Sequence, residues 1–366
     1  MNPLTELLAY GQSFWYDNIR RKYLIDGTVH RLITEDGLRG MTSNPSIFEK
    51  AIGMGEEYDQ QIEQVTSDGM DVTATYEALA LSDIQAACDL FADVYRYSEG
   101  KDGYVSLEVS PHLSHDQEGT ILEARRLFSK VDRRNVMIKV PATPAGIPAI
   151  QQLIGEGINI NVTLMFSMDH FDAVASAYIA GLTQWVDGGG KAKEVSSVAS
   201  FFISRVDTAV DKALSEKNDP RAESLFGKAA IANSKLVYRR FKEIFYGERF
   251  EALRSAGAEV QRLLWASTST KNPRYPDTLY VDELIGPETV NTMPPKTIEA
   301  FREHGRVGNS LERGITESVQ VMEQIAELDI NLDLVTEQLQ KDGVRAFADS
   351  YDKLLATLRS KMEILS

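Results

Sequence analysis

Lys139 stands alone inside an apolar run that extends from Asn135 to Thr143. Branched residues dominate this run and Pro141 follows them, a pattern typical of a buried β-strand. Burial disfavours the charged form of an amine, and a neutral amine is a nucleophile toward carbonyl carbon. We therefore expect Lys139 to form a Schiff base with a ketone. The alternative is a lysine at a sheet edge, or one whose stem carries the amine to solvent.

Schiff-base chemistry also needs groups that move protons, and two acidic residues lie on predicted strands. Glu108 belongs to an alternating segment at residues 104–110, and Asp17 follows an aromatic-rich run. We expect Glu108, helped by Thr163, to handle the water of imine formation, and Asp17 to take a hydroxyl proton beside the bond that breaks. Alternatively, Asp17 could only cap the next helix, and Glu108 could be a solvated charge on a strand face.

Further polar residues that follow predicted strands suit a sugar phosphate. Asn44 and Ser200 can bind hydroxyl groups, whereas Arg205 offers a fork geometry that matches phosphate. We expect Ser267 and Lys271 to complete this anion site. Asn44 precedes a proline and could be only a turn residue, and Arg205 could be a surface charge that starts a helix.

Strand and helix patterns alternate along the whole chain and must position these residues. The predicted strands lie at residues 13–19, 38–44, 104–110, 135–143, 159–167, 195–206, 262–267 and 289–294. Helical periodicity fills most of the segments between them. Eight strands that alternate with helices predict an α/β fold, a (β/α)₈ TIM barrel with additional N- and C-terminal helices.

In such a barrel the inward side chains of all strands converge on the axis, and the C-terminal ends of the strands form the active-site mouth. The residues expected to point inward are Glu108, Lys139, Asn161, Thr163 and Ser200. Lys139 would then be interior, where an edge position is not possible. We expect residues 1–366 to form a single barrel domain with a helical tail from about residue 296. This acidic tail could cover either the barrel mouth or a subunit interface.

Composition narrows the class of protein. With 43% hydrophobic and 25% charged residues, the chain has an ordinary globular balance, and its net charge of −15 argues against nucleic-acid or membrane-surface binding. Cys88 is the only cysteine, and His112 and His115 have no visible third ligand, so we expect neither a disulfide nor a metal site. No signal peptide or membrane span is apparent, so we expect a cytoplasmic protein.

Short motifs in this order resemble the transaldolase family over nearly the whole chain. They are residues 14–18, 42–46, 107–109, 138–143, 161–164 and 265–268, with 282–287, 291–294 and 347–351 resembling its longer bacterial subtype. Each motif is weak by itself, but their order and spread are specific. One departure concerns the loop after the seventh strand. There the shorter members place an arginine after Ala-Ser, whereas this chain continues with Thr268–Lys271. Lys271 as a phosphate ligand therefore follows from the alignment.

The resemblance implies a barrel enzyme of the non-oxidative pentose phosphate pathway without metal or organic cofactor. It would transfer a dihydroxyacetone unit from sedoheptulose 7-phosphate or fructose 6-phosphate to glyceraldehyde 3-phosphate or erythrose 4-phosphate. Lys139 would attack the C2 carbonyl, Asp17 would take the C4 hydroxyl proton, and Phe202 would keep water from the enamine. We expect the protein to be either a monomer or a homodimer, and the sequence does not distinguish the two.

Two rival functions remain open from the sequence. One is a Schiff-base fructose 6-phosphate aldolase, which releases dihydroxyacetone because its enamine does not survive until an acceptor arrives. The other is a non-catalytic barrel that only binds sugar phosphates.

Overall fold

A closed barrel of eight parallel strands forms the centre of the computed structural model, which describes residues 2–365. Each strand pairs with the next along the chain, and β8 pairs with β1. The strands are β1 (Gln12–Asp17), β2 (Gly40–Thr42), β3 (Tyr104–Glu108), β4 (Val136–Pro141), β5 (Ile160–Met165), β6 (Ser197–Phe202), β7 (Arg262–Ala266) and β8 (Thr289–Met293). The predicted TIM barrel is therefore confirmed. Residues 1 and 366, the ends of the predicted domain, lie outside the described range.

Helices precede the first strand and connect the others. Up to β4 they are α1 (Pro3–Glu6), η1 (Leu7–Tyr10), α2 (Arg21–Ile25), α3 (Thr28–Glu35), α4 (Pro45–Met54), η2 (Glu56–Tyr58), α5 (Asp59–Ser67), α6 (Val72–Leu90), α7 (Ala92–Tyr97), η3 (Pro111–Leu113) and α8 (Gln117–Val131). Between β4 and β8 they are α9 (Gly146–Gly155), α10 (Met168–Asp187), η4 (Ala192–Glu194), α11 (Ser204–Ser215), η5 (Ala222–Leu225), α12 (Ala229–Phe245), α13 (Glu248–Ser255) and α14 (Leu279–Glu283). Among the described helices, none combines the length and apolar character needed to cross a membrane.

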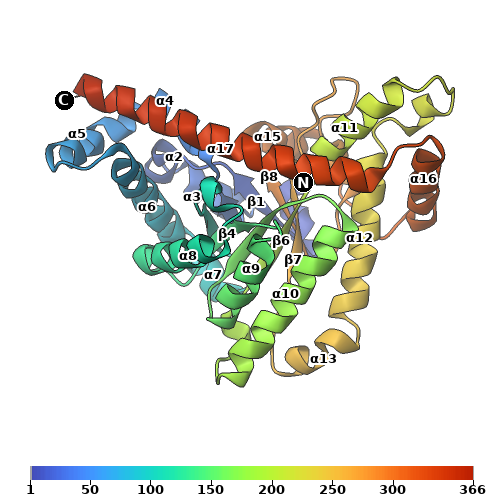
Figure 1. The fold of residues 1–366 in the computed structure, drawn as a ribbon, viewed down its shortest axis with the longest axis horizontal. Helices are drawn as coiled ribbons and strands as arrows, with labels where there is room; N and C mark the ends of the chain where they lie inside the picture. The colour runs from blue at the N-terminus through green and yellow to red at the C-terminus, as the bar shows by residue number, and fades with distance from the viewer. Residues whose placement is uncertain (1, 366) are drawn as a thin grey trace.

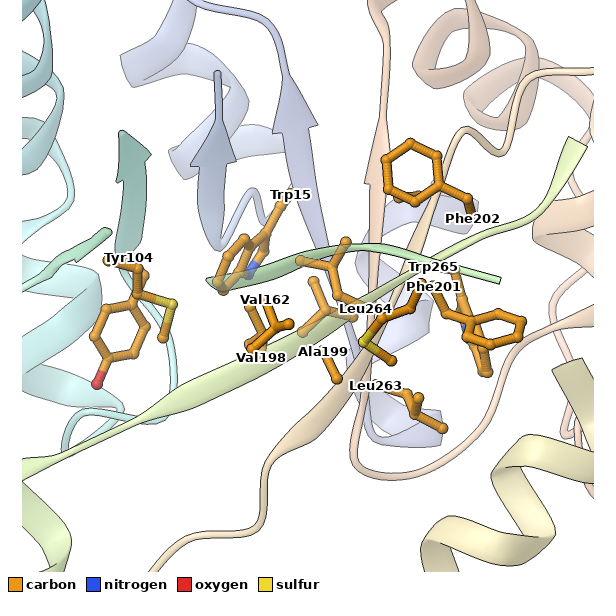
Figure 2. Close-up of a cluster of buried hydrophobic side chains, with 14 of the residues drawn as sticks. Trp15, Tyr104, Val162, Val198, Ala199, Phe201, Phe202, Leu263, Leu264 and Trp265 are labelled. Atoms are coloured by element: carbon orange, nitrogen blue, oxygen red, sulfur yellow. The ribbon is translucent and has the colours of Figure 1, made fainter. Parts of the chain in front are cut away.

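The strands are buried on both faces. All residues of β4, β5 and β6 are buried, since helices cover the outer face and the other strands cover the inner one. Figure 2 shows part of this core, in which the ring of Phe201 on β6 meets the ring of Trp265 on β7 edge to face, with centroids 6.2 Å apart. Because both faces of β4 are buried, a lysine in this strand cannot reach solvent easily and is a candidate for a functional role.

The C-terminal segment is not the continuous helix that the sequence suggested from residue 296. It consists of α15 (Pro295–His304), α16 (Ile315–Glu327) and α17 (Leu332–Leu365). Gly305 ends α15, and α16 begins after Gly314, whose φ of 71° places it in the left-handed region that helices exclude. Because α15 follows β8 as the last barrel helix, the additional tail is α16 and α17.

The long helix α17 lies across the mouth of the barrel (Figure 1, red). Gln340 on this helix donates hydrogen bonds of 3.0 Å to the carbonyl oxygens of Ala142 and Leu164, which lie near the C-terminal ends of β4 and β5. A Cβ atom at Gly343 would lie 2.8 Å from Leu164 Cδ2, so a larger residue there would force the leucine side chain to shift. Of the two positions left open by the sequence, the tail covers the mouth.

Candidate active site

A cavity of about 500 Å³ opens at the C-terminal ends of the strands, below α17. The predicted site residues that line it are Asp17, Asn44, Lys139, Thr163, Ser200, Phe202, Arg205, Ser267 and Lys271. Residues from six different strands or strand-following loops thus meet at one place, as expected for the catalytic end of a TIM barrel. Glu108 also lies at this end of the barrel, but it lines neighbouring cavities and not this one.

Lys139 points into the barrel from β4, and its side chain is only 6% exposed. Its Nζ lies 3.7 Å from Glu108 Oε2 and donates a hydrogen bond of 3.3 Å to the carbonyl oxygen of Ser43. The register of β3 and β4 places Glu108 directly beside Lys139. The alternative of an edge or solvent-reaching lysine is therefore wrong, and the amine is held next to a carboxyl group inside the barrel.

Burial raises the pKa of Glu108 to about 7, although the nearby charge of Lys139 acts in the opposite direction. Glu108 Oε2 has no hydrogen-bond partner among residues 2–365. The side chain borders a second cavity of about 320 Å³, which Tyr76 and Tyr351 also line. A carboxyl group with a pKa near neutral can both give and accept a proton. Because the side chain is buried, the alternative of a solvated surface charge is wrong.

Replacing Glu108 with glutamine is expected to slow imine formation roughly 10²-fold. In the unmodified protein the proton-donating form of Glu108 exists below a pKa of about 7 and is lost as the pH rises through that value. The rate of imine formation should therefore fall on the alkaline side, and Glu108→Gln should lack this limb. Borohydride trapping after rapid mixing, between about pH 6 and 9, measures the rate.

Glu77→Gln is the matched control, because Glu77 lines the same second cavity but binds Arg126 at 2.7 Å. It should keep the alkaline limb. If Glu108→Gln kept the limb as well, the ionisation would belong to another group.

Asp17 ends β1 and accepts a hydrogen bond of 2.7 Å from the hydroxyl of Thr42. The next helix, α2, has Arg20 at its N-cap, so the interpretation of Asp17 as a helix cap is wrong. Burial raises the pKa of Asp17, while Lys139, Thr42 and Lys271 act in the opposite direction. A buried carboxylate with a raised pKa is a stronger base toward a hydroxyl group than a solvated one.

Thr163 and Ser200 lie on the inner face of the barrel. Thr163 Oγ1 is buried and has no hydrogen-bond partner in the described part of the chain. Ser200 donates a hydrogen bond of 2.6 Å to Asn161 Oδ1, and Asn161 in turn donates one of 2.9 Å to Ser106 Oγ. This chain of hydrogen bonds fixes the orientation of Ser200, whereas the hydroxyl of Thr163 is left available.

Asn44 has a structural role beside its place in the cavity wall. It is the N-cap of α4, and its Oδ1 accepts hydrogen bonds from the backbone N–H of Ile47 at 3.0 Å and from Ser46 Oγ at 2.7 Å. The side-chain oxygen is thus occupied by the helix, which orients the side-chain N–H₂ group. The oxygen therefore has the structural role of a helix cap, whereas the binding of a substrate hydroxyl by the N–H₂ group stays a prediction.

Three cations at the cavity wall, Arg205, Lys271 and Lys50, lack a carboxylate ion pair within residues 2–365. Arg205 lies in the first turn of α11, and burial lowers its pKa. Burial also lowers the pKa of Lys271, and the charge of Arg205 adds to this effect. The hydroxyls of Ser204 and Ser267 lie 3.0 Å apart beside them. Arg205 in the first turn of α11 and Lys271 in the loop after β7 thus bring positive charge without a carboxylate partner to one wall, an arrangement that suits an anion such as phosphate.

Arg205→Met is expected to raise the KM for fructose 6-phosphate about 10- to 100-fold with little change in kcat, since the contact to phosphate is lost. The free energy of unfolding should not fall, because no buried carboxylate loses its partner.

Arg262→Met is the contrasting control. Arg262 binds buried Asp102 at 2.9 Å at the other end of the barrel, so its loss should cost roughly 3 kcal/mol without changing KM. Steady-state kinetics measure KM, and denaturant titration measures the free energy of unfolding, for each variant. An unchanged KM in Arg205→Met would refute the phosphate contact.

Three residues of the site were not assigned from the sequence. Thr42 binds Asp17, Lys50 on α4 lines the cavity, and Phe347 on α17 places its ring over the amine of Lys139. Thr42 and Phe347 belong to the motifs noted in the sequence, which was the available signal. Nothing in the pattern around Lys50 distinguishes it from a solvated helix residue.

The described residues contain no group of three or more His, Cys, Asp or Glu side chains arranged to hold a metal ion. His112, considered as a ligand from the sequence, instead hydrogen-bonds Asp352 on α17 at 2.8 Å.

Comparison with known proteins gives matches over nearly the full length. Residues 14–358 match the family described as Transaldolase/Fructose-6-phosphate aldolase. The chain is 44% identical to transaldolase 2 of a Nostoc species over 377 residues, covering 100% of this chain and 99% of the relative. It is 46% identical to a Parafrankia transaldolase, with 98% of each chain covered. It is also 46% identical to a transaldolase of Thiobacillus denitrificans, covering 98% of this chain and 100% of the relative.

Proposed function

This chain belongs to the transaldolase/fructose-6-phosphate aldolase family, and we propose that it is a transaldolase that uses Lys139 as its Schiff-base lysine. The observation that carries the assignment of the lysine is its contact with Glu108 inside the barrel, at 3.7 Å. The donor would be sedoheptulose 7-phosphate or fructose 6-phosphate. The acceptor would be glyceraldehyde 3-phosphate or erythrose 4-phosphate, as in the non-oxidative pentose phosphate pathway.

Imine formation is the first step. The unprotonated amine of Lys139 adds to the C2 carbonyl of the ketose, and the C–N bond forms while the carbonyl oxygen becomes a hydroxyl. Glu108 gives this hydroxyl a proton, and it leaves as water. The free hydroxyl of Thr163 orients this water. Glu108 Oε2 and Thr163 Oγ1 support these roles, since neither atom has a hydrogen-bond partner among the described residues.

Carbon–carbon cleavage follows. Asp17 takes the proton of the C4 hydroxyl, the C3–C4 bond breaks, and its electron pair moves toward the iminium nitrogen to give an enamine. The aldose phosphate leaves and the acceptor aldehyde takes its place. The enamine then attacks the new carbonyl, Asp17 returns its proton to the new hydroxyl, and hydrolysis of the imine frees the product.

Substrate binding uses the remaining cavity residues. Asn44 and Ser200 hold hydroxyl groups of the ketose, and Arg205, Ser267 and Lys271 hold its phosphate. A cavity of about 500 Å³ lies within the range of small-molecule sites.

An assay with and without acceptor tests the function. Fructose 6-phosphate with erythrose 4-phosphate should give sedoheptulose 7-phosphate and glyceraldehyde 3-phosphate, whereas fructose 6-phosphate alone should give little free dihydroxyacetone. Cleavage that is undiminished without acceptor would identify an aldolase. Binding of fructose 6-phosphate without any product would identify a non-catalytic barrel.

A further inference from the structure

Phe347 is the residue of the C-terminal helix that reaches the reacting lysine. Its ring centroid lies 5.6 Å from Lys139 Nζ, and it lines the same cavity as Asp17 and Thr163. The residue is 9% exposed, so the ring is almost wholly enclosed. The ring therefore belongs to the site although it comes from outside the barrel.

The position of this ring is fixed by contacts along α17. The buried residues of the helix recur at the spacing of one helical face, and they are Thr336, Gln340, Gly343, Phe347, Leu354 and Leu358. Gln340 bonds two carbonyl groups at the barrel mouth, each at 3.0 Å. Toward the other end, Lys361 pairs with Asp59 at 2.6 Å and bonds the carbonyl oxygen of Ile52 at 3.1 Å. A helix held on both sides of Phe347 keeps the ring in place over the amine.

The enamine that remains on Lys139 after C3–C4 cleavage has two possible fates. In transfer, its C3 atom forms a bond to the acceptor aldehyde. In release, C3 takes a proton instead, water adds to C2, the C–N bond breaks, and dihydroxyacetone leaves with the free amine restored. Both routes end in hydrolysis of an imine, but only release needs a proton at C3 and water at C2 before the acceptor has reacted. A nonpolar group that keeps water from the enamine therefore suppresses release more than transfer.

We propose that Phe347 sets the partition between transfer and release by excluding water from the space above the Lys139 imine. Phe202, which the sequence analysis expects to keep water from the enamine, lines the same cavity. Its ring packs on that of Phe166 with centroids 5.3 Å apart. Phe202 belongs to a barrel strand, whereas Phe347 belongs to the covering helix. The helix thus supplies a specificity-determining side chain, and this inference rests on the proposed transaldolase function.

Three variants of the full-length protein test the inference. Phe347→Ala removes the ring, Phe347→Leu keeps most of its apolar bulk, and Leu354→Ala removes a buried side chain from the same helix face without touching the cavity. For each variant, dihydroxyacetone release from fructose 6-phosphate without acceptor is measured against transfer to erythrose 4-phosphate. Phe347→Ala should raise the ratio of release to transfer about tenfold, whereas Phe347→Leu should raise it much less.

Leu354→Ala should lower the free energy of unfolding yet leave this ratio unchanged, because the contacts of Gln340 and Lys361 still hold the helix on both sides of Phe347. An unchanged ratio in Phe347→Ala, or an equal rise in Leu354→Ala, would overturn the inference. Borohydride trapping with fructose 6-phosphate is run on the same samples and reports whether the imine still forms. Failure of the unmodified protein to transfer or to form an imine would refute the proposed function itself, which is a different outcome.

Discussion

Replacing Lys139 with alanine is expected to lower kcat/KM for dihydroxyacetone transfer by on the order of 10⁴-fold or more, because the covalent intermediate can no longer form. Every step of the proposed reaction passes through the bond between this amine and C2. The remaining groups, Asp17 and Glu108, can polarise a bound ketose but cannot store the electron pair of the broken bond. A coupled assay of transfer from fructose 6-phosphate to erythrose 4-phosphate measures the loss.

The barrel should remain folded in this variant. The carboxyl group of Glu108 loses its nearest cation, but its pKa is already raised to about 7, so it can take up a proton and become neutral. Lys235→Met is the matched control, since Lys235 is also buried and pairs with Glu283 at 3.1 Å outside the cavity. It should show a comparable loss of thermal stability with normal activity. If Lys139→Ala failed to fold, the lysine would have a structural role. If the folded variant retained activity, the lysine would not be the nucleophile.

Replacing Asp17 with asparagine is expected to slow C3–C4 cleavage roughly 10³-fold, because the amide cannot accept the C4 hydroxyl proton. Asparagine can keep the hydrogen bond from Thr42, which is 2.7 Å long, so the site should stay in place. Imine formation, which uses Glu108, should change far less. Single-turnover experiments separate the two, with borohydride trapping for the imine and detection of glyceraldehyde 3-phosphate for cleavage.

Thr42→Val provides the control for this second prediction. It removes the hydrogen bond that favours the ionised form of Asp17 but leaves the carboxyl group itself, so it should slow cleavage only modestly and move its pH dependence upward. Equal slowing of imine formation and cleavage in Asp17→Asn would remove the assigned role of Asp17 as the base.

The sequence identified the barrel and most of the cavity because the relevant signals are local. A lysine within a fully apolar strand such as β4, and polar residues where the strands end, are visible in one segment at a time. Their meeting point then follows from the geometry of a closed parallel barrel. Lys139, Asp17 and Arg205 can therefore be predicted as site residues without knowledge of their neighbours.

The residues that were missed depend on relations between distant segments. The apolar face of α17 shows that the helix packs on something, but its pattern does not say which surface, so Phe347 could not be assigned to the amine. The second cavity beside Glu108 is formed by α6, α8 and α17 together and has no local signature. Asn44 shows a further limit, because a helix cap and a substrate ligand have the same sequence pattern before Pro45.

Trapping the covalent intermediate tests the central claim most directly. The unmodified protein is incubated with fructose 6-phosphate, reduced with borohydride and digested, and the modified peptide is identified by mass spectrometry. The account predicts one substrate-dependent adduct on the peptide that contains Lys139. An adduct on a different lysine, or no adduct in a protein that still transfers dihydroxyacetone, would contradict it.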